Sequence, residues 1–455
     1  MKPSLPALRL AAVLAVLSAA PAGRCQTTLP APGTTGSGSD PASPVAADRW
    51  DFHAQGTFVG QAVLPFHADY AGPGSLRSRG EAKETVSLDI IGGARLWQGA
   101  EFRVDGLMWQ GYGLSDARGV AGFPNGEAFR KGTEVPNATL SRVFVRQVVG
   151  FGGGEETVEA GPLNFGGQRD ANRLTLTAGK MSAKDVFDAN RYANDPRTQF
   201  LNWSLMANGA WDYPADALGF APGVALELDA GDWSARYGLF GVMRSANGVG
   251  VDQSFGKARA MVWELEHRHR LGTHPGAVRL LLDLNRGRMR RYQDTLADAA
   301  LLADPSLQKG YNGNLGYGLN LEQEIAGDLG MFSRLGWSEG DTEPWMFTDV
   351  DRTASLGISL KGTRWGRGSD TVGVAGVWNE ISGVHRRFLA AGGQGILVGE
   401  NRLNYGPEEI LETYYRFQVA GAWHATLDYQ CVNHPAYNRD RGPAHVFGLR
   451  LHWEY

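Results

Sequence analysis

The chain has 455 residues, of which 62 are glycine, 10% are aromatic and 20% are charged, and its formal net charge at pH 7 is −4. A charge this close to neutral excludes the basic stripe of a nucleic-acid-binding domain. No run of about 18 apolar residues follows the N-terminus, which excludes a membrane-spanning helix. The mean hydropathy of −0.27 does not exclude a transmembrane β-barrel, because the strands of such a barrel turn only alternate residues toward lipid.

The N-terminus has the pattern of a secretory signal peptide. Two basic residues precede an apolar run from Leu10 to Leu17, and small residues up to Ala20 follow it. This pattern predicts a signal peptide over residues 1–20, cleaved after Ala20 or Ala22, and export from the cytoplasm. Residues 21–48 are rich in Pro, Gly, Ser, Thr and Ala without periodicity, which predicts a disordered periplasmic lead-in.

From Trp50 onward, apolar and polar residues alternate with a period of two almost everywhere. Between Val86 and Ile90, for example, apolar side chains occupy the even positions, and Ser87 and Asp89 lie between them. Such a segment is a strand with one apolar and one polar face. We predict strands near residues 50–61, 84–97, 99–112, 139–150, 172–180, 222–229, 233–243, 256–271, 276–286, 314–326, 329–338, 353–362, 369–379, 409–420, 423–432 and 445–455.

The links between these strands alternate in length. Links of a few residues, such as 230–232 and 420–422, alternate with long polar links, such as 287–312 and 380–408. Short turns at one end and long loops at the other are the layout of an outer-membrane barrel. Residues 49–455 are therefore predicted to form an all-β fold, a transmembrane antiparallel β-barrel of about 16 strands with short periplasmic turns and long extracellular loops.

An even number of strands places both ends of the barrel on the periplasmic side. For this reason we assign residues 200–207, which also have a strand-like pattern, to a long loop over residues 181–219. The link over residues 151–171 departs from the rule, because it belongs to the short-turn end and is not short.

The chain ends in HVFGLRLHWEY, in which apolar and charged residues alternate. We expect the odd-numbered side chains, from Phe447 to Tyr455, to face lipid, and we expect Arg450, His452 and Glu454 to face the lumen. This strand then closes the barrel against the strand that begins at Trp50. Its aromatic ending resembles the last strand that outer-membrane proteins present to the barrel-assembly machinery.

Charged side chains of both signs fall on the inward faces of the predicted strands. Rings of charged side chains set selectivity in channels, and a mixture of signs disfavours a strong preference for either ion sign. Arginine and carboxylate groups also supply donors and acceptors for hydroxyl groups. The alternative is a lattice of salt bridges that stiffens the barrel wall. The inward charges on the first four strands are Arg95, Glu101, Arg103, Asp105, Arg142 and Arg146.

Loop 181–219 is long and rich in Trp, Tyr and Phe, and long loops with their own packing are usually functional. We expect Ser182 to cap a short helix that runs to Asn190. The loop either folds inward and narrows the channel or packs as a cap on the barrel rim. Its acidic and amide side chains do not have the spacing of an EF-hand loop, so no metal site is predicted for Asp185, Asp188, Asn190 and Asp195.

Two internal segments and the aromatic C-terminus carry a family resemblance. GFPNGEAF (Gly122–Phe129) and LTAGKMSAKDVFDANRYANDPRTQFLNWSLMANGAWDYPAD (Leu176–Asp216) resemble the carbohydrate-selective porins of the OprB type. The resemblance implies an outer-membrane channel for glucose and related sugars, with a constriction formed by arginines, acidic residues and aromatic residues. We expect the six charged residues named above to lie on its wall, with stacking faces supplied by Trp109, Trp203 and Trp211.

Passive, carbohydrate-selective diffusion without cofactor or catalysis is the function we predict. A general ion-conducting porin without sugar selectivity is the alternative, and an outer-membrane barrel enzyme is a further one, although no GxSxG nucleophile elbow is present. The expected partners are small sugars, outer-membrane lipid and the barrel-assembly machinery, and no nucleic acid is expected. The sequence leaves open whether the unit is one chain or a homotrimer, and whether Cys25 and Cys431 form a disulfide or remain free.

Overall fold

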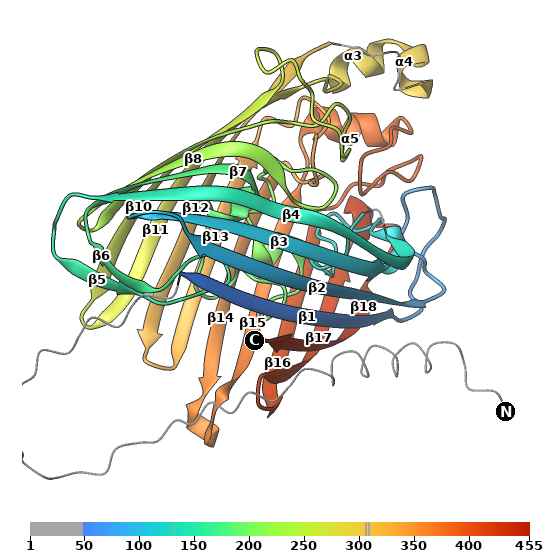
Figure 1. Cartoon of the computed structure of the whole chain (residues 1–455). Helices are drawn as coiled ribbons and strands as arrows, with labels where there is room; N and C mark the ends of the chain where they lie inside the picture. The colour runs from blue at the N-terminus through green and yellow to red at the C-terminus, as the bar shows by residue number, and fades with distance from the viewer. Residues whose placement is uncertain (1–48, 131, 305–306, 308–309) are drawn as a thin grey trace, which may run out of the picture. The chain divides into compact units, whose positions relative to one another are not determined.

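A computed structural model describes residues 49–130, 132–304, 307 and 310–455. In this part of the chain, 16 antiparallel strands close into a barrel, as Figure 1 shows. The predicted antiparallel barrel is therefore confirmed. The predicted signal peptide, the lead-in and Cys25 lie outside the described residues. No helix in the described ranges is long and apolar enough to cross a membrane.

The barrel strands follow one another around the wall in chain order, and β4 is followed by β7. They are β1 (Trp50–Val63), β2 (Glu81–Arg95), β3 (Ala100–Gly111), β4 (Thr133–Gly150), β7 (Arg173–Met181), β8 (Ala221–Ala230), β9 (Trp233–Phe240), β10 (Arg259–Leu271), β11 (His274–Gly287), β12 (Asn312–Ala326), β13 (Leu329–Ser338), β14 (Arg352–Gly362), β15 (Arg367–Glu380), β16 (Glu408–Ala420), β17 (Trp423–Asn433) and β18 (Ala444–Glu454).

The connections divide into a short-turn end and a long-loop end, as predicted. The long loops used below are L2 (112–132), L3 (182–220), L4 (241–258), L6 (339–351), L7 (381–407) and L8 (434–443). In the described part of the chain, the long-loop end contains only short α-helices. These are α2 (Trp203–Met206) in L3, α3 (Tyr292–Ala297) and α4 (Ala299–Ala303) between β11 and β12, and α5 (Gly383–Ala390) in L7.

The strands alternate between an apolar outer face and a polar inner face. In β11, the Leu280 side chain is 55% exposed, whereas Arg279 and Asp283 are 7% and 3% exposed because they point into the barrel. The closing strand follows the same rule: Phe447 is 46% exposed and Arg450 is fully buried. β18 pairs with β1 in the register Gly56↔Trp453, so the predicted closure is confirmed.

L3 contains no strand and only short helical turns. Residues 200–207 include α2, which confirms their assignment to a loop. The helix expected from Ser182 to Asn190 is wrong, because only Ala183–Asp185 forms a 3-10 turn. The helix cannot continue through Asp188, because this residue has a φ of 55°. Its N–H also donates to Glu264 of β10 instead of to a preceding carbonyl.

The link between β4 and β7 folds as a separate hairpin of two strands, β5 (Glu155–Val158) and β6 (Gly167–Asp170). It lies at the short-turn end of the barrel (Figure 1). Three successive glycines, Gly152 to Gly154, begin it with φ values of 83° to 93°, which favour glycine. The hairpin therefore explains why this link is long where the layout predicts a short one.

A charge on the outer face tests its contact with lipid. We expect Leu280→Arg, in the middle of β11, to lower the free energy of unfolding by about 2–4 kcal/mol, and Leu271→Arg, beside a short turn, by about 0–1 kcal/mol. The reason is that a lipid-facing charge costs less near the interface. Urea unfolding of protein refolded into lipid vesicles measures both variants, and equal losses would contradict the assignment of this face to lipid.

Candidate functional site

L3 crosses the inside of the barrel and is held there by carboxylates of the wall. Glu412 of β16 accepts the backbone N–H groups of Leu201 and Asn202 at 2.6 and 3.0 Å. Glu322 of β12 accepts the N–H of Arg191 at 2.7 Å. Both side chains are buried, and each of these hydrogen bonds pairs a backbone N–H that would otherwise lack a partner inside the barrel. L3 therefore occupies the interior rather than capping the rim.

Asp188 fastens the same loop to β13. Its carboxylate lies 3.0 Å from Nε of Arg334 and 3.1 Å from Nζ of Lys184. Burial by itself raises the pKa of Asp188, but the positive charges of Arg334 and Lys184 outweigh this effect and lower the pKa to about 2. Asp188 therefore stays ionised near neutral pH. Its partners neutralise it, so it is a structural anchor.

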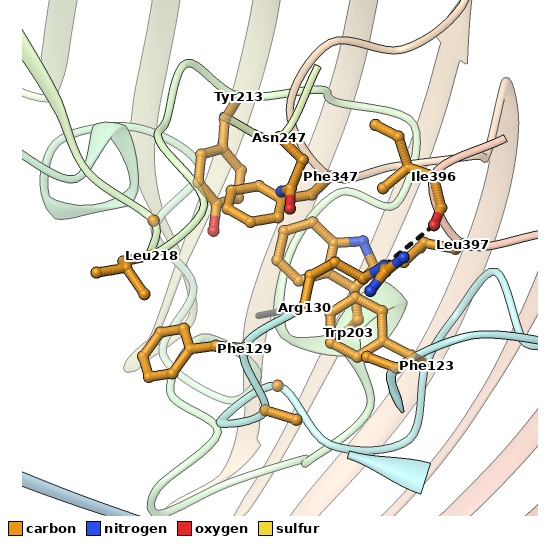
Figure 2. Close-up of a pocket in the computed structure, with 14 residues that line it drawn as sticks. Phe123, Phe129, Arg130, Trp203, Tyr213, Leu218, Asn247, Phe347, Ile396 and Leu397 are labelled. Carbon is orange, nitrogen blue, oxygen red and sulfur yellow. Dashed lines mark hydrogen bonds between the residues drawn. The ribbon is translucent and has the colours of Figure 1, made fainter. Parts of the chain in front are cut away.

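An aromatic pocket lies between L2, L3, L4, L6 and L7 (Figure 2). The Trp203 ring stacks on Phe123 with 5.4 Å between ring centroids and 9° between ring planes. Phe347 and Tyr213 also lie beside Trp203, at centroid distances of 5.6 and 5.4 Å. The cavity has a volume of about 60 Å³. Its lining also includes Phe129, Arg130, Leu218, Asn247, Ile396 and Leu397.

The aromatic pocket has few polar groups. Arg130 donates from Nε to the Ile396 carbonyl at 3.2 Å (Figure 2). The Nε1 donor of Trp203 is buried and has no acceptor in the described part of the chain. Buried donors are normally paired. The pocket thus combines aromatic faces with one unpaired N–H, an arrangement suited to a ligand that has both C–H faces and hydroxyl groups.

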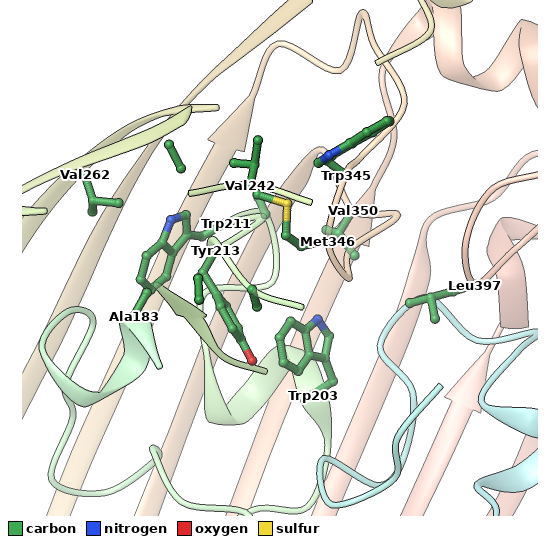
Figure 3. Close-up of a cluster of buried hydrophobic side chains, with 14 of the residues drawn as sticks. Ala183, Trp203, Trp211, Tyr213, Val242, Val262, Trp345, Met346, Val350 and Leu397 are labelled. Atoms are coloured by element: carbon green, nitrogen blue, oxygen red, sulfur yellow. The ribbon is translucent and has the colours of Figure 1, made fainter. Parts of the chain in front are cut away.

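An apolar cluster inside the long-loop end fixes the positions of the pocket walls. Figure 3 shows Trp211 and Tyr213 of L3 near Val242 of L4 and near Trp345 and Met346 of L6. The carboxylate between the two L3 aromatics, Asp212, accepts the N–H groups of Trp345 and Met346 at 2.6 and 3.1 Å. L6 is therefore held on L3 by both apolar packing and charge-assisted hydrogen bonds.

Two of the predicted wall arginines contact the link between β4 and β7. Arg103 makes two hydrogen bonds to Asp51, at 2.6 and 2.8 Å, and its guanidinium lies 4.3 Å from the centre of the Phe165 ring. Arg95 lies 4.5 Å from the same ring and donates to the Gly166 carbonyl at 2.8 Å. Phe165 thus packs against two guanidinium groups and is 4% exposed.

Glu101 and Arg146 bind the same segment. They form an ion pair at 2.9 Å. Glu101 also accepts the Phe165 N–H at 3.0 Å, and Arg146 donates to the Leu163 carbonyl at 2.7 Å. The structure therefore brings four of the predicted residues together, but with protein groups as their partners.

The other predicted residues lie at four places. Arg142 connects Asp105, at 2.7 Å, with Asp185 of L3, at 2.8 Å. Trp109 packs edge-on against Phe129, at 5.7 Å between centroids. Trp211 is in the apolar cluster, and Trp203 is the one predicted residue that lines the aromatic pocket. A role in contacting a solute stays a prediction for all nine residues.

Sequence reasoning missed most of the lining of the aromatic pocket. Phe123, Phe129 and Arg130 come from or directly follow the GFPNGEAF segment of L2, and Phe347 comes from L6. The L2 segment contributed to the family resemblance, so its two phenylalanines carried a usable signal. The sequence around Phe347 carried no such signal, because only the fold of L6 over L3 brings Phe347 to Trp203.

A closed barrel with an apolar outer face and inward-folded loops is the architecture of an outer-membrane channel. Residues 74–455 match the family model described as carbohydrate-selective porin, OprB family, and the chain belongs to this family. The predicted family, the outer-membrane location and the function of a carbohydrate-selective porin are thereby confirmed. The family and the fold are those of channels rather than of enzymes.

One solved structure supports the fold. The high-pH structure of OprB from Pseudomonas putida is similar with a TM-score of 0.68 and 16% identity, over 89% of this chain and 94% of that chain. The low-pH structure of the same protein has a TM-score of 0.48 and 12% identity, over 89% of this chain and 92% of that chain. OccK2 (OpdF) from Pseudomonas aeruginosa has a TM-score of 0.43 and 11% identity, over 89% of this chain and 97% of that chain. No curated protein matches the sequence.

The anchoring role of Glu412 predicts an effect on current. Glu412→Gln keeps the side-chain shape but leaves one oxygen for two N–H groups, which weakens the docking of L3 by about 1–3 kcal/mol. We expect larger and noisier single-channel currents in planar bilayers. Glu409→Gln, which changes a glutamate on the outer face of the same strand, is the control and should behave as the wild type. Unchanged currents in Glu412→Gln would contradict the anchoring role.

Asp349 predicts a pH dependence in the contact between L6 and L7. Its carboxylate accepts the N–H groups of Leu397 and Val398 at 2.5 and 3.1 Å. Burial raises its pKa from 3.8 to about 6, although the charge of His385 opposes the shift. The folded state therefore binds this proton more tightly than the unfolded state, so stability is lost as pH rises from about 4 to about 6.

Hydrogen exchange at the Leu397 and Val398 amides measures this loss. After correction for intrinsic exchange rates, we expect less protection at pH 7 than at pH 4, by up to ~3 kcal/mol. Asp349→Asn cannot ionise, so its protection should not change with pH. Equal protection of the wild type at both pH values would contradict the prediction.

Proposed function

We propose that glucose and related neutral sugars diffuse passively through this barrel, without cofactor and without catalysis. In this proposal the long-loop end faces the outside and the short-turn end faces the periplasm. The observation that carries the proposal is the aromatic pocket on the long-loop side of L3, with the unpaired Nε1 donor of Trp203 beside aromatic faces.

The physical basis is a partial exchange of solvent. The pocket volume of about 60 Å³ has room for only a few water molecules, so a sugar passing there exchanges part of its water shell for protein contacts. Aromatic faces replace water on the apolar face of the ring, and Trp203 Nε1 replaces one hydrogen bond. Such a contact is weak enough to release the sugar, and fast release is a condition for conduction.

The partners beyond sugars belong to the same proposal. The apolar outer face, exemplified by Leu280, is in contact with outer-membrane lipid. We propose that the barrel-assembly machinery binds the ending of β18, where Trp453 and Tyr455 alternate with polar residues. The choice between a single chain and a homotrimer stays open.

Liposome swelling with purified protein tests sugar selectivity. We expect faster swelling in glucose than in amino acids of matched size, and we expect Trp203→Ala to reduce this ratio toward one, because it removes both a stacking face and the unpaired donor. Trp378→Ala is the matched control, since Trp378 is 45% exposed on the outer face. Equal rates for glucose and amino acids in the wild type would leave a general porin as the function.

A further inference from the structure

A second cavity, here called the vestibule, lies between L3 and the β12–β13 turn at the short-turn end. It has a volume of about 390 Å³, which is within the range of about 300–1,000 Å³ of small-molecule sites. Residues of L3 form one side, among them Tyr192 and Gln199, and inward positions of β12 to β16 form the other. The vestibule shares no lining residue with the aromatic pocket, although L3 contributes to both.

The charged side chains that line the vestibule are Arg191, Glu324, Asp328, Lys361 and Arg416. Asp328 is neutralised by Arg364, which makes hydrogen bonds of 2.6 and 3.1 Å to its two oxygens. Glu324 is shared between His274, at 3.0 Å, and Arg191, at 3.8 Å. Both carboxylates of the vestibule are therefore already paired.

Two of its cations have no such partner. Among the described residues, neither Lys361 nor Arg416 makes an ion pair within 4.0 Å, and Nε of Arg416 is buried without an acceptor. The arginines on β9 to β11 differ, since Arg236 and Arg279 each bind two or more glutamates. Lys361 and Arg416 therefore bring two positive charges to the vestibule that no carboxylate of the described residues pairs with within 4.0 Å.

Uncharged hydrogen-bonding groups surround these cations. Tyr192, Thr198, Ser359, Thr371 and Tyr414 line the vestibule, and all carry hydroxyl groups. Tyr192 is held against the wall at Gly330, where an added Cβ would lie 2.0 Å from its ring. The absence of a side chain at Gly330 therefore leaves the space that the Tyr192 ring occupies beside the vestibule.

We propose that the vestibule is a transient binding site for monosaccharides that carry a carboxylate or a phosphate. Lys361 and Arg416 bind the anionic group, and the surrounding hydroxyl groups exchange hydrogen bonds with those of the sugar. Cationic side chains in a narrow, low-dielectric passage concentrate anions there. This inference rests on the proposed sugar channel and extends its substrates from neutral sugars to acidic ones.

Bi-ionic reversal potentials in planar bilayers test the proposal. With potassium gluconate on one side and potassium chloride on the other, they give the permeability of gluconate relative to chloride. We expect Lys361→Gln with Arg416→Gln to lower this ratio about tenfold, which corresponds to a loss of about 1.4 kcal/mol. Glucose swelling of the same variant should fall much less. Repeating the measurement with glucose 6-phosphate shows whether carboxylate or phosphate is preferred.

Arg270→Gln is the matched control, since it removes the same charge at the short-turn end from a side chain that does not line the vestibule and that donates to the Thr273 carbonyl rather than to a carboxylate. It should leave the ratio unchanged, and an equal fall in this control would overturn the proposal by showing a general effect of charge. An unchanged ratio in the double variant, or in Lys361→Gln alone if the double variant does not fold, would also overturn it. If liposomes that contain the wild-type protein do not swell faster in glucose than in amino acids, the proposed function is overturned instead. The swelling assay and the permeability ratio are separate measurements, so the two failures can be distinguished.

Discussion

A loop that folds into a barrel must find partners for its backbone N–H groups, and in this protein carboxylates of the wall supply them. Glu412 holds two N–H groups of L3, and Glu408 holds those of Ala121 and Gly122 in L2 and of Ala436 in L8. An unpaired backbone group inside the wall costs free energy comparable to a lost hydrogen bond. The positions of the glutamates therefore decide where the loops lie, and the loops decide the form of the passage.

The same constraint explains why so few wall charges remain available to a solute. Most arginines and carboxylates of the inner face are paired with one another, with loop backbone or, at Arg95 and Arg146, with the link between β4 and β7. The lattice of salt bridges and the solute-binding wall, which the sequence left as alternatives, occupy different parts of the barrel. L3 separates an aromatic pocket at the long-loop end from a cationic vestibule at the short-turn end.

Much of the fold was predictable because its signals are local. Alternation along each strand, the alternation of short and long links and the even number of strands together predict a closed barrel, and the structure confirms it. The site was predictable only in part. Trp203 was found because the segment around it resembles a known family, whereas Phe347 reaches Trp203 only through the contact of L6 with Asp212. The helix expected after Ser182 failed because a tertiary hydrogen bond to Glu264 replaced a local one.

By itself, the sequence determined which residues face lipid, how many strands close the barrel and which family the chain resembles, since these follow from the two-residue period of a strand and from continuous segments. It also marked the link over residues 151–171 as too long for its end of the barrel. Only the tertiary structure decided that this link folds against Arg95, Glu101, Arg103 and Arg146, and that Lys361 and Arg416 stay unpaired. The physical reason is that ion pairing depends on which side chains meet inside the barrel, and this is set by the register of the strands and the path of the loops, which the two-residue period of a strand does not give.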